Sequence, residues 1–199
     1  MAEYTALVEA GNALVELLRE RMTPEPIHNK ELIALRSPHE SENSQLTVWL
    51  FHIEEDQHNT QAGYYQYTKD IQRIQPSSYQ LSFLITAHSK APAQLKEADQ
   101  YRIIGSALQI IKDQPVLEKK YLQGSLLDTE AQLHLSVERP NFDQIVKIWN
   151  NTAAPYKLSI VCKVASIAID SKRMRTVGRV SDVSLQFDEK EIVKGGRDD

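Results

Sequence analysis

The chain has 199 residues and a formal net charge of −4, and 41% of its residues are hydrophobic while 25% are charged. A chain of this length and composition is expected to fold as one globular domain with a substantial core, which excludes a disordered protein. The net negative charge argues against a nucleic-acid partner, because neutralising phosphates requires a concentrated basic surface.

The single cysteine, Cys162, cannot form an internal disulfide, and it lies in an apolar strand pattern that suits a small buried thiol. The first residues lack a basic region followed by an apolar run, so no signal peptide is predicted. No window approaches about 18 uninterrupted apolar residues, so we expect no spanning helix and no membrane partner. These features together predict synthesis in the cytoplasm.

The chain begins with a predicted helix over residues 4–21. Its apolar side chains recur at three-four spacing and form one stripe, made of Tyr4, Leu7, Val8, Leu14, Val15, Leu17 and Leu18. The two prolines within residues 23–26 end this helix. A short strand over residues 32–36 and a polar loop over residues 37–43 are predicted next.

The strand predicted over residues 46–54 is unusual because both of its faces are apolar. One face carries Leu46, Val48 and Leu50, and the other carries Trp49, Phe51 and Ile53. A strand with one wet face would alternate apolar and polar residues, so we expect a helix layer on one side of this strand. Another layer or a second subunit is expected on the other side.

Residues 55–75 are polar, and they include Tyr64, Tyr65 and Tyr67. The segment predicts a long exposed loop, a type that is more often functional or ordered by a partner than idle.

The central unit of the sequence is a strand followed by a long helix. Tyr79, Leu81, Phe83, Ile85 and Ala87 share one face of an extended segment over residues 79–88. After a polar break, an amphipathic helix is predicted from the apolar residues Ile103, Ile104, Ala107, Leu108, Ile110 and Ile111, and it ends at residues 113–115.

Further along, residues 133–138 alternate as a half-buried strand. A short helix follows, with Asn141 as its predicted cap and Gln144 in the reciprocal position. A long strand over residues 155–170 comes next. Its apolar parity slips near residues 165–166, which predicts either a bulge or a strand that leaves the core to meet a neighbour.

A last strand is predicted at Val183, Leu185 and Phe187, before a charged flexible tail over residues 191–199. We therefore expect one domain over residues 1–190. We expect the last strand to lie at or near an edge where another protein adds strands.

No catalytic, cofactor-binding or metal-binding residue is predicted. The six histidines are dispersed, and no pair has the tight spacing of a zinc site. Residues 54–56 form an acidic cluster that is typical of a solvated turn. The isolated glycines offer no phosphate cradle, and a buried Cys162 is a poor nucleophile.

Positive charge gathers at Lys172, Arg173, Arg175 and Arg179, beside the strand whose parity slips. Such runs usually keep a hairpin end in water. The alternative is a docking patch for an acidic protein surface.

Several segments, read in order, resemble one protein family. They are the first helix, the strand over residues 48–55 followed by Asn59, the strand and helix over residues 81–109, residues 135–138, the pair Ile148-Trp149, and residues 154–160. Together they resemble the amino-terminal domain of the cap, or tail-terminator, proteins of extracellular contractile injection systems of the antifeeding-prophage and virulence-cassette type.

This resemblance implies an α+β domain with a mostly antiparallel or mixed sheet flanked by two main helices. It implies a structural cap, without enzymatic activity, that forms a hexameric ring on the distal end of the inner tube and contractile sheath and stops polymerisation. The expected partners are copies of the chain and the sheath and inner-tube proteins of a particle that can be released. Arg175, Arg179, Val183, Leu185 and Phe187 are the expected interface residues. The alternative is a stand-alone ligand-binding or regulatory domain with its site at residues 64–67.

Overall fold

The structure is a computed structural model, and it describes residues 2–40, 43–56, 63–129, 132–139, 142–150 and 155–177. Its body is built on a five-stranded mixed sheet with the strand order β1-β2-β5-β7-β6. The strands are β1 (Ile33–Leu35), β2 (Leu46–Glu55), β5 (Ser77–Ala87), β7 (Ser159–Ile169) and β6 (His134–Glu138). Strand β1 runs parallel to β2, and every other neighbouring pair is antiparallel.

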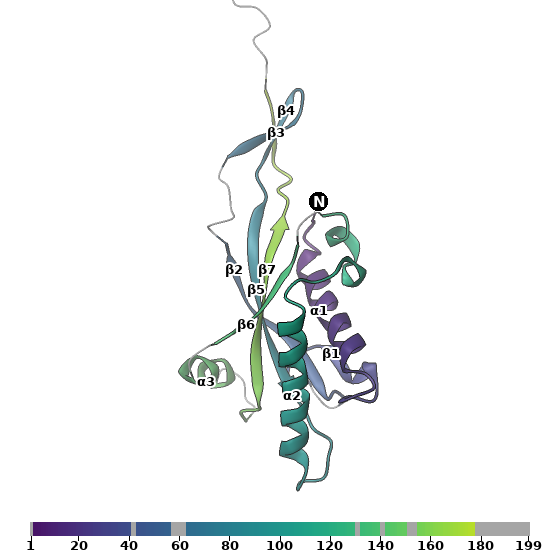
Figure 1. Cartoon of the computed structure of the whole chain (residues 1–199). Helices are drawn as coiled ribbons and strands as arrows, with labels where there is room; N and C mark the ends of the chain where they lie inside the picture. Colours follow the sequence, from purple (N-terminus) through teal and green to yellow (C-terminus); the bar gives the residue numbers. More distant parts are fainter. Residues whose placement is uncertain are drawn as a thin grey trace, which may run out of the picture.

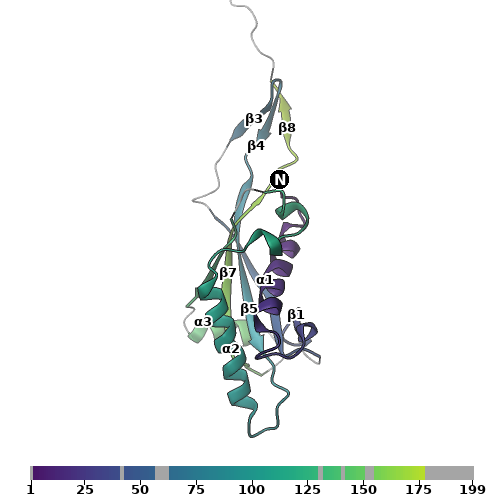
Figure 2. The same cartoon turned by 45° about the vertical axis from the view of Figure 1, so that its right-hand side comes forward.

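A second sheet has the order β3-β4-β8, and its strands are β3 (Tyr64–Thr68), β4 (Ile71–Ile74) and β8 (Met174–Thr176). Only residues 75–76 separate β4 from β5, and residues 170–173 separate β7 from β8. The central pair of the body therefore continues outward, and the second sheet projects away from the helices as a tip (Figures 1 and 2). We call this second sheet the tip sheet.

Helices cover both faces of the main sheet. Helices α1 (Ala6–Met22) and α2 (Lys96–Asp113) lie on one side, and α3 (Phe142–Asn150) lies on the other (Figure 1). Three short 3-10 turns are described as well, η1 (Lys30–Leu32), η2 (Lys119–Tyr121) and η3 (Gly124–Leu126). This arrangement confirms the predicted α+β fold with two main helices, and α3 was also predicted as a short helix.

Helix α1 packs closely on the sheet because its buried stripe begins with small residues. Ala6, Ala10 and Ala13 are fully buried. At Gly11, an added Cβ would lie 3.0 Å from Cδ1 of Leu35 and 3.3 Å from the ring of Phe83. The absence of a side chain there lets the helix backbone approach the strands. The main core lies between this face of the sheet and the two long helices, and it contains Leu14, Leu17, Leu81, Phe83, Ile103 and Cys162.

Helix α2 begins at Lys96, before the apolar residues that predicted it. Its buried residues are Ile103, Ile104, Ala107 and Ile111, so its polar first turns lie outside the core. The predicted stop is confirmed, because the helix ends at Asp113 and Pro115 follows.

The parity slip in β7 is a β-bulge. Tyr79 pairs with Ile167 and Leu81 pairs with Val164, so β7 holds one extra residue at this point. Ser166 has φ 69°, a left-handed conformation that non-glycine residues rarely adopt. Ile167 is fully buried in the same core as Val164. The bulge therefore returns the apolar residues to the core, and the alternative of a strand leaving the core is wrong for Ile167.

A second bulge, which the sequence reading missed, lies in β2. The pairing passes from Leu50 with Phe83 to His52 with Ser82, so Phe51 is the extra residue. Ile53 then pairs with Leu81, a residue of the main core. The prediction that Ile53 shares a face with Trp49 and Phe51 is wrong, because the bulge exchanges the two faces of the strand.

The second apolar face of β2 is covered within the same chain. Trp49 and Phe51 pack against a smaller core made of Leu84, Trp149 and Val161, to which α3 contributes Ile145 and Ile148. The indole Nε1 of Trp149 donates a hydrogen bond to Oγ of Ser159 over 3.2 Å. A second layer was one of the two predicted covers for this face, and α3 supplies it.

Two local predictions are wrong. Residues 64–74 form the hairpin of β3 and β4, where a long loop was predicted. Asp56 was placed in a solvated turn, but it is buried and its backbone N–H donates to the carbonyl oxygen of Ser78 over 2.8 Å. The predicted cap Asn141 and the predicted strand at residues 183–187 lie outside the described residues. The predicted domain boundaries stay a prediction.

Candidate assembly surfaces

Among the predicted interface residues, Arg175 lies in the part of the chain that the structure describes. It projects from β8, the edge strand of the tip sheet, and it is exposed. Its guanidinium carbon lies 4.0 Å from the ring centroid of Tyr64, and its Nε and Nη2 donate to Oε1 of Gln72 over 2.9 and 2.7 Å. Arg175 therefore holds β8 to the hairpin as well as adding positive charge to the tip.

Lys172 and Arg173 are exposed beside Arg175. The structure thus brings three of the four basic residues to the base and edge of the tip sheet. Arg179, Val183, Leu185 and Phe187 lie outside the described residues, so their role as an interface stays a prediction.

The tyrosines of the hairpin make contacts within their own sheet. Tyr64 lies under Arg175, and Tyr67 lies 5.5 Å from the guanidinium carbon of Arg73. Arg73 is buried, and its Nε donates to the carbonyl oxygen of Ser171. The rings of Tyr64 and Tyr67 therefore pack against arginine side chains of their own sheet, on the surface that a ligand would otherwise contact.

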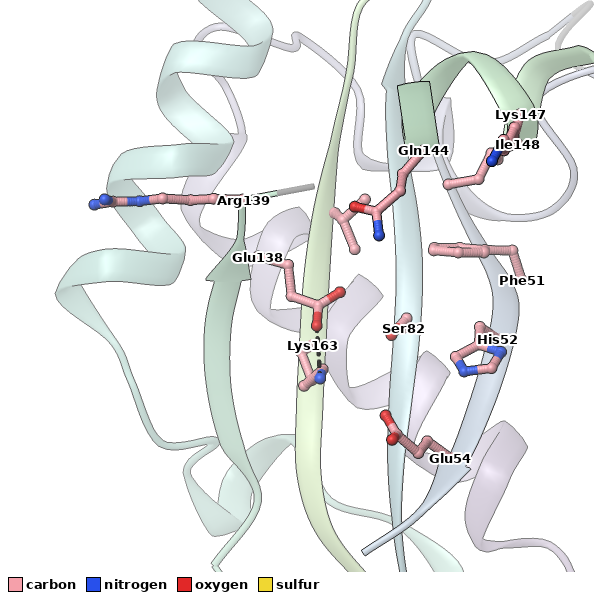
Figure 3. Close-up of a pocket in the computed structure, with 11 residues that line it drawn as sticks. Phe51, His52, Glu54, Ser82, Glu138, Arg139, Gln144, Lys147, Ile148 and Lys163 are labelled. Carbon is pink, nitrogen blue, oxygen red and sulfur yellow. Dashed lines mark ion pairs between the residues drawn. The ribbon is translucent and has the colours of Figure 1, made fainter. Parts of the chain in front are cut away.

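A groove of about 430 Å³ lies on the α3 side of the main sheet (Figure 3). Strand β2 contributes Phe51, His52 and Glu54, and α3 contributes Gln144 and Ile148. In Figure 3 the side chain of Arg139 points away from the others. The bulge in β2 explains why His52 and Glu54 face this groove.

An ion pair lies in this groove. Nζ of Lys163 and Oε1 of Glu138 form an ion pair of 2.6 Å (Figure 3), so each neutralises the other. Among the described residues, no hydrogen bond joins the hydroxyl of Ser82 to His52, as activation of a serine would require. Burial raises the pKa of Cys162 to about 12, which keeps its thiol protonated.

A second hollow, of about 640 Å³, lies beside the start of α2 and is lined by Lys90, Lys96, Lys157 and His88. Oγ1 of Thr47 lies 2.9 Å from Nε2 of His88, and Nζ of Lys157 lies 3.2 Å from its Nδ1. Burial and the neighbouring Lys157 lower the pKa of His88 to about 4, so this imidazole is neutral at pH 7. Both ring nitrogens have close neighbours, which fits a structural histidine.

The sequence reading missed an open edge on the main sheet. Strand β1 pairs only with residues 46–48 of β2, and the backbone N–H of Arg36 donates to the carbonyl oxygen of Val48 over 3.0 Å. Within the described part of the chain, no strand pairs with residues 49–55 on that side. An apolar groove of about 330 Å³ lies beside this edge, lined by Leu7, Val8, Leu35, Arg36, Val48, Trp49, Leu50 and Phe83. The lengths of the two predicted strands already indicated an open edge, because a strand over residues 32–36 is too short to pair with all of residues 46–54.

The described residues contain neither a metal-ligand cluster nor a membrane-spanning helix. No group of three or more histidine, cysteine, aspartate or glutamate residues could hold a metal ion there. None of the described helices has the length and apolar character needed to cross a bilayer.

Two solved structures have a similar fold. The sheath/tube terminator of an extracellular contractile injection system, PVC, in its extended state is 14% identical, with a TM-score of 0.67, over 96% of this chain and 65% of that chain. The tube-terminating cap of the anti-feeding prophage is 17% identical, with a TM-score of 0.61, over 90% of this chain and 61% of that chain. The protein therefore has the α+β fold of these terminators.

The chain spans less than two thirds of the length of either structure. The comparison with curated proteins gives no match. Residues 9–182 match the family model described as the Pvc16 N-terminal domain. The chain thus belongs to the Pvc16 N-terminal domain family, which confirms the resemblance seen in the sequence.

Proposed function

We propose that the protein terminates or caps the sheath and inner tube of a phage-tail-like contractile injection particle. The observation that carries this proposal is the family match over residues 9–182, together with the shared fold of a sheath/tube terminator and a tube-terminating cap. The action is geometric and breaks no covalent bond. One face of the assembly matches the last layer of the tube and sheath, and the opposite face offers no site for another layer.

The shape of the chain supports this role. The tip sheet projects from the body and has an exposed edge strand, β8, with basic residues beside it (Figure 2). A projecting sheet with an open edge can take an added strand from a neighbouring protein. We propose that the tip sheet contacts the sheath through Arg175. We propose that the segment with Arg179, Val183, Leu185 and Phe187 is also a protein interface.

We also propose that copies of the chain form a hexameric ring that matches a six-fold tube. A closed ring requires each copy to present two different surfaces, one for each neighbour. The open edge of β2 belongs to the main sheet and is separate from the tip sheet, so it can serve one of these two contacts while the tip sheet contacts the sheath. The ring would be part of a particle that the producing cell can release.

A ligand-binding or regulatory domain was the alternative prediction, with its site at residues 64–67. Tyr64 and Tyr67 are engaged by the arginines of their own sheet. We therefore retain the terminator as the proposed function.

A polymerisation experiment tests the terminator role. Sheath and tube subunits of the same particle are assembled with and without the full-length protein, and particle lengths are measured by negative-stain microscopy. We expect capped ends and a narrow length distribution when the protein is present. Unchanged lengths, with no extra density at either end, would refute the proposed function.

A further inference from the structure

We propose that the open edge of β2, with its apolar groove, binds residues 179–189 of a neighbouring copy as an added antiparallel strand. The inference deepens the proposed function, on which it rests for ring closure, because it names the surface that joins one copy to the next. The alternative occupant of this edge is a strand from the sheath, and the experiment below separates the two.

The edge itself has the features of a strand acceptor. In the described residues, β1 covers only the first three positions of β2, and the hydrogen bond from the N–H of Arg36 to Val48 is the last backbone hydrogen bond along that side. Every second residue of the remaining strand turns its backbone N–H and C=O toward this side. An uncovered edge is a template for another strand, and proteins usually protect it.

The side chains next to the open edge are apolar, so they could pack against the apolar face of a donated strand. Val8 is 51% exposed and lies with Leu7 on α1, on one side of the groove, while Leu50 and Phe83 lie on the other. An exposed valine in the first turns of a helix that is otherwise well packed leaves apolar surface in contact with water. Burying such surface provides about 25 cal/mol per Å² of favourable free energy.

The carboxy-terminal sequence has the matching pattern. Val183, Leu185 and Phe187 alternate with Ser184 and Gln186. In an extended segment, residues at a spacing of two point to the same side. The three apolar residues would therefore face the groove together, and the polar residues would face the α3 side of the sheet.

The chain cannot supply this strand to its own edge. The N–H of Val177 donates to the carbonyl oxygen of Asp70 over 3.0 Å, so the described chain ends at the far turn of the tip sheet. The end of the open edge nearest the tip lies at Ile53, which pairs with Leu81 of β5. Leu81 is ten residues along the chain from Ile71 of β4, which corresponds to about 33 Å at the rise of a strand. The six residues from Val177 to Val183 span at most about 21 Å. With Val183 beside Ile53, the donor is therefore a second copy.

Charge favours the antiparallel orientation. The far end of β2 carries Glu54 and Glu55, and the near end lies beside the exposed Arg36. An antiparallel strand brings Arg179 toward the two glutamates, where Asp182 is the one like charge, and it brings Asp188 and Glu189 toward Arg36. The parallel orientation would instead place Asp188 beside the glutamates, where like charges repel.

Disulfide trapping between two full-length variants tests the contact. One variant carries His52→Cys, at an exposed position of β2 on the α3 side, and the other carries Ser184→Cys, Gln186→Cys or Asp188→Cys. The native Cys162 does not interfere, because it is fully buried. After mixing and mild oxidation, we expect a disulfide-linked dimer for at least one tail position and at least a tenfold lower yield from each variant alone.

A matched control uses Glu97→Cys, an exposed position on α2, with the same tail variants. We expect at least a tenfold lower yield of dimer there. An equal yield at Glu97, or no dimer from any tail position under conditions where the wild-type chain forms rings, would overturn the inference. A tail that crosslinks to added sheath subunits in preference to His52 would also overturn it.

A second pair of variants tests the groove without cysteines. Val8→Arg places a charge in the groove at an exposed position, and Leu95→Arg makes the same change at a residue that is 60% exposed ahead of α2. We expect Val8→Arg to raise the dissociation constant for self-association, measured by sedimentation, at least tenfold. We expect Leu95→Arg to leave this constant at the wild-type value. Equal self-association of the two variants would overturn the inference.

The two proposals fail in different ways. If the wild-type chain forms rings and limits particle length but the tail does not crosslink to β2, the contact is wrong and the terminator role stands. If the crosslink forms but particle length is unchanged, the contact stands and the terminator role fails.

Discussion

Gly124 and Gly105 are two glycines with opposite environments. Gly124 has φ +58°, and an added Cβ would collide with the carboxylate of Glu9. Oε2 of Glu9 accepts hydrogen bonds from Oγ of Ser125 and from the backbone N–H of Leu126, both over 2.9 Å, and so ties η3 to α1. Gly105 lies within α2, where an added Cβ meets nothing within 4 Å.

Alanine at these two positions should therefore change stability in opposite directions. We expect Gly124→Ala to lower the free energy of unfolding by about 1–3 kcal/mol, because alanine is strained at this φ and displaces Glu9. We expect Gly105→Ala to raise it by about 0.5–1 kcal/mol, because alanine is the better helix former. Urea unfolding followed by circular dichroism measures both. A stabilised Gly124→Ala variant would show that η3 does not depend on this contact.

His88 should make the protein less stable in acid. Its pKa is about 4 in the folded chain and 6.5 in the reference state, because burial and Lys157 disfavour the charged imidazole. The unfolded chain therefore binds a proton that the folded chain does not between these values, so stability falls as the pH drops from about 7 to 4. The full shift corresponds to about 3 kcal/mol.

A His88→Gln variant isolates this contribution, because the other titrating groups remain. We expect the stability of the wild-type chain to fall by about 3 kcal/mol more than that of the variant between pH 7 and pH 4. Urea unfolding at several pH values gives the comparison. Parallel curves for the two chains would mean that the folded state accommodates the charged imidazole.

Among the strands, the bulge of β7 sets the direction of every side chain beyond it. Ser166 adopts φ 69°, which glycine tolerates and β-branched residues do not. We expect Ser166→Gly to leave the free energy of unfolding unchanged or raise it by up to about 1 kcal/mol, and Ser166→Val to lower it by about 1–3 kcal/mol. Thermal unfolding of the two variants checks this. Equal melting temperatures would mean that the bulge relaxes without cost.

The two bulges show what the sequence pattern predicts and where it becomes ambiguous. In β7, the buried residues Val164 and Ile167 are three positions apart, which breaks the period of two. The polar residue Ser166 lies between them, so the sequence alone reveals the slip. In β2, the same three-residue step leads from Leu50 to Ile53, but apolar Phe51 fills the gap. The sequence therefore fits a regular strand with two apolar faces equally well, and only the pairing with β5 decides.

The tip hairpin was missed for a related reason. Residues 64–68 and 71–74 are rich in tyrosine, threonine and isoleucine, which favour strands, but residues 69–70 lack the glycine or asparagine of a typical hairpin turn. The long helices and central strands could be predicted because each buries a regular stripe in one core. The open edge of β2 could not, because it depends on how far β1 extends beside its partner.

At the scale of the whole molecule, the body and the tip sheet are stabilised differently. The body has a large apolar core on one face and a smaller one under α3. The tip sheet relies on strand pairing and on arginine–tyrosine contacts, and the residues of β8 are exposed while those of β4 are half-buried or buried. In the proposed terminator role, the body would supply stability and the projecting tip would contact the partner, so changes in exposed charges at the tip should affect binding more than folding.

The basic residues of the tip allow this separation to be tested. Lys172 and Arg173 are exposed, whereas Arg175 also holds β8 to Gln72 and Tyr64. We expect Lys172→Glu with Arg173→Glu to keep the free energy of unfolding within about 0.5 kcal/mol of the wild-type value, because exposed charges contribute little to stability. Binding to purified sheath subunits should weaken at least tenfold at low salt, and the difference should shrink as salt screens the charges.

The matched control reverses two exposed lysines in the body, Lys112 in α2 and Lys119 in η2. It changes the net charge by the same amount, so a general effect of charge would weaken binding equally in both variants. Loss of binding confined to the tip variant would identify the basic residues as a docking patch for an acidic surface. Equal binding by the tip variant and the wild-type chain, measured by co-sedimentation, would leave those residues with the simpler role of keeping the strand end in water.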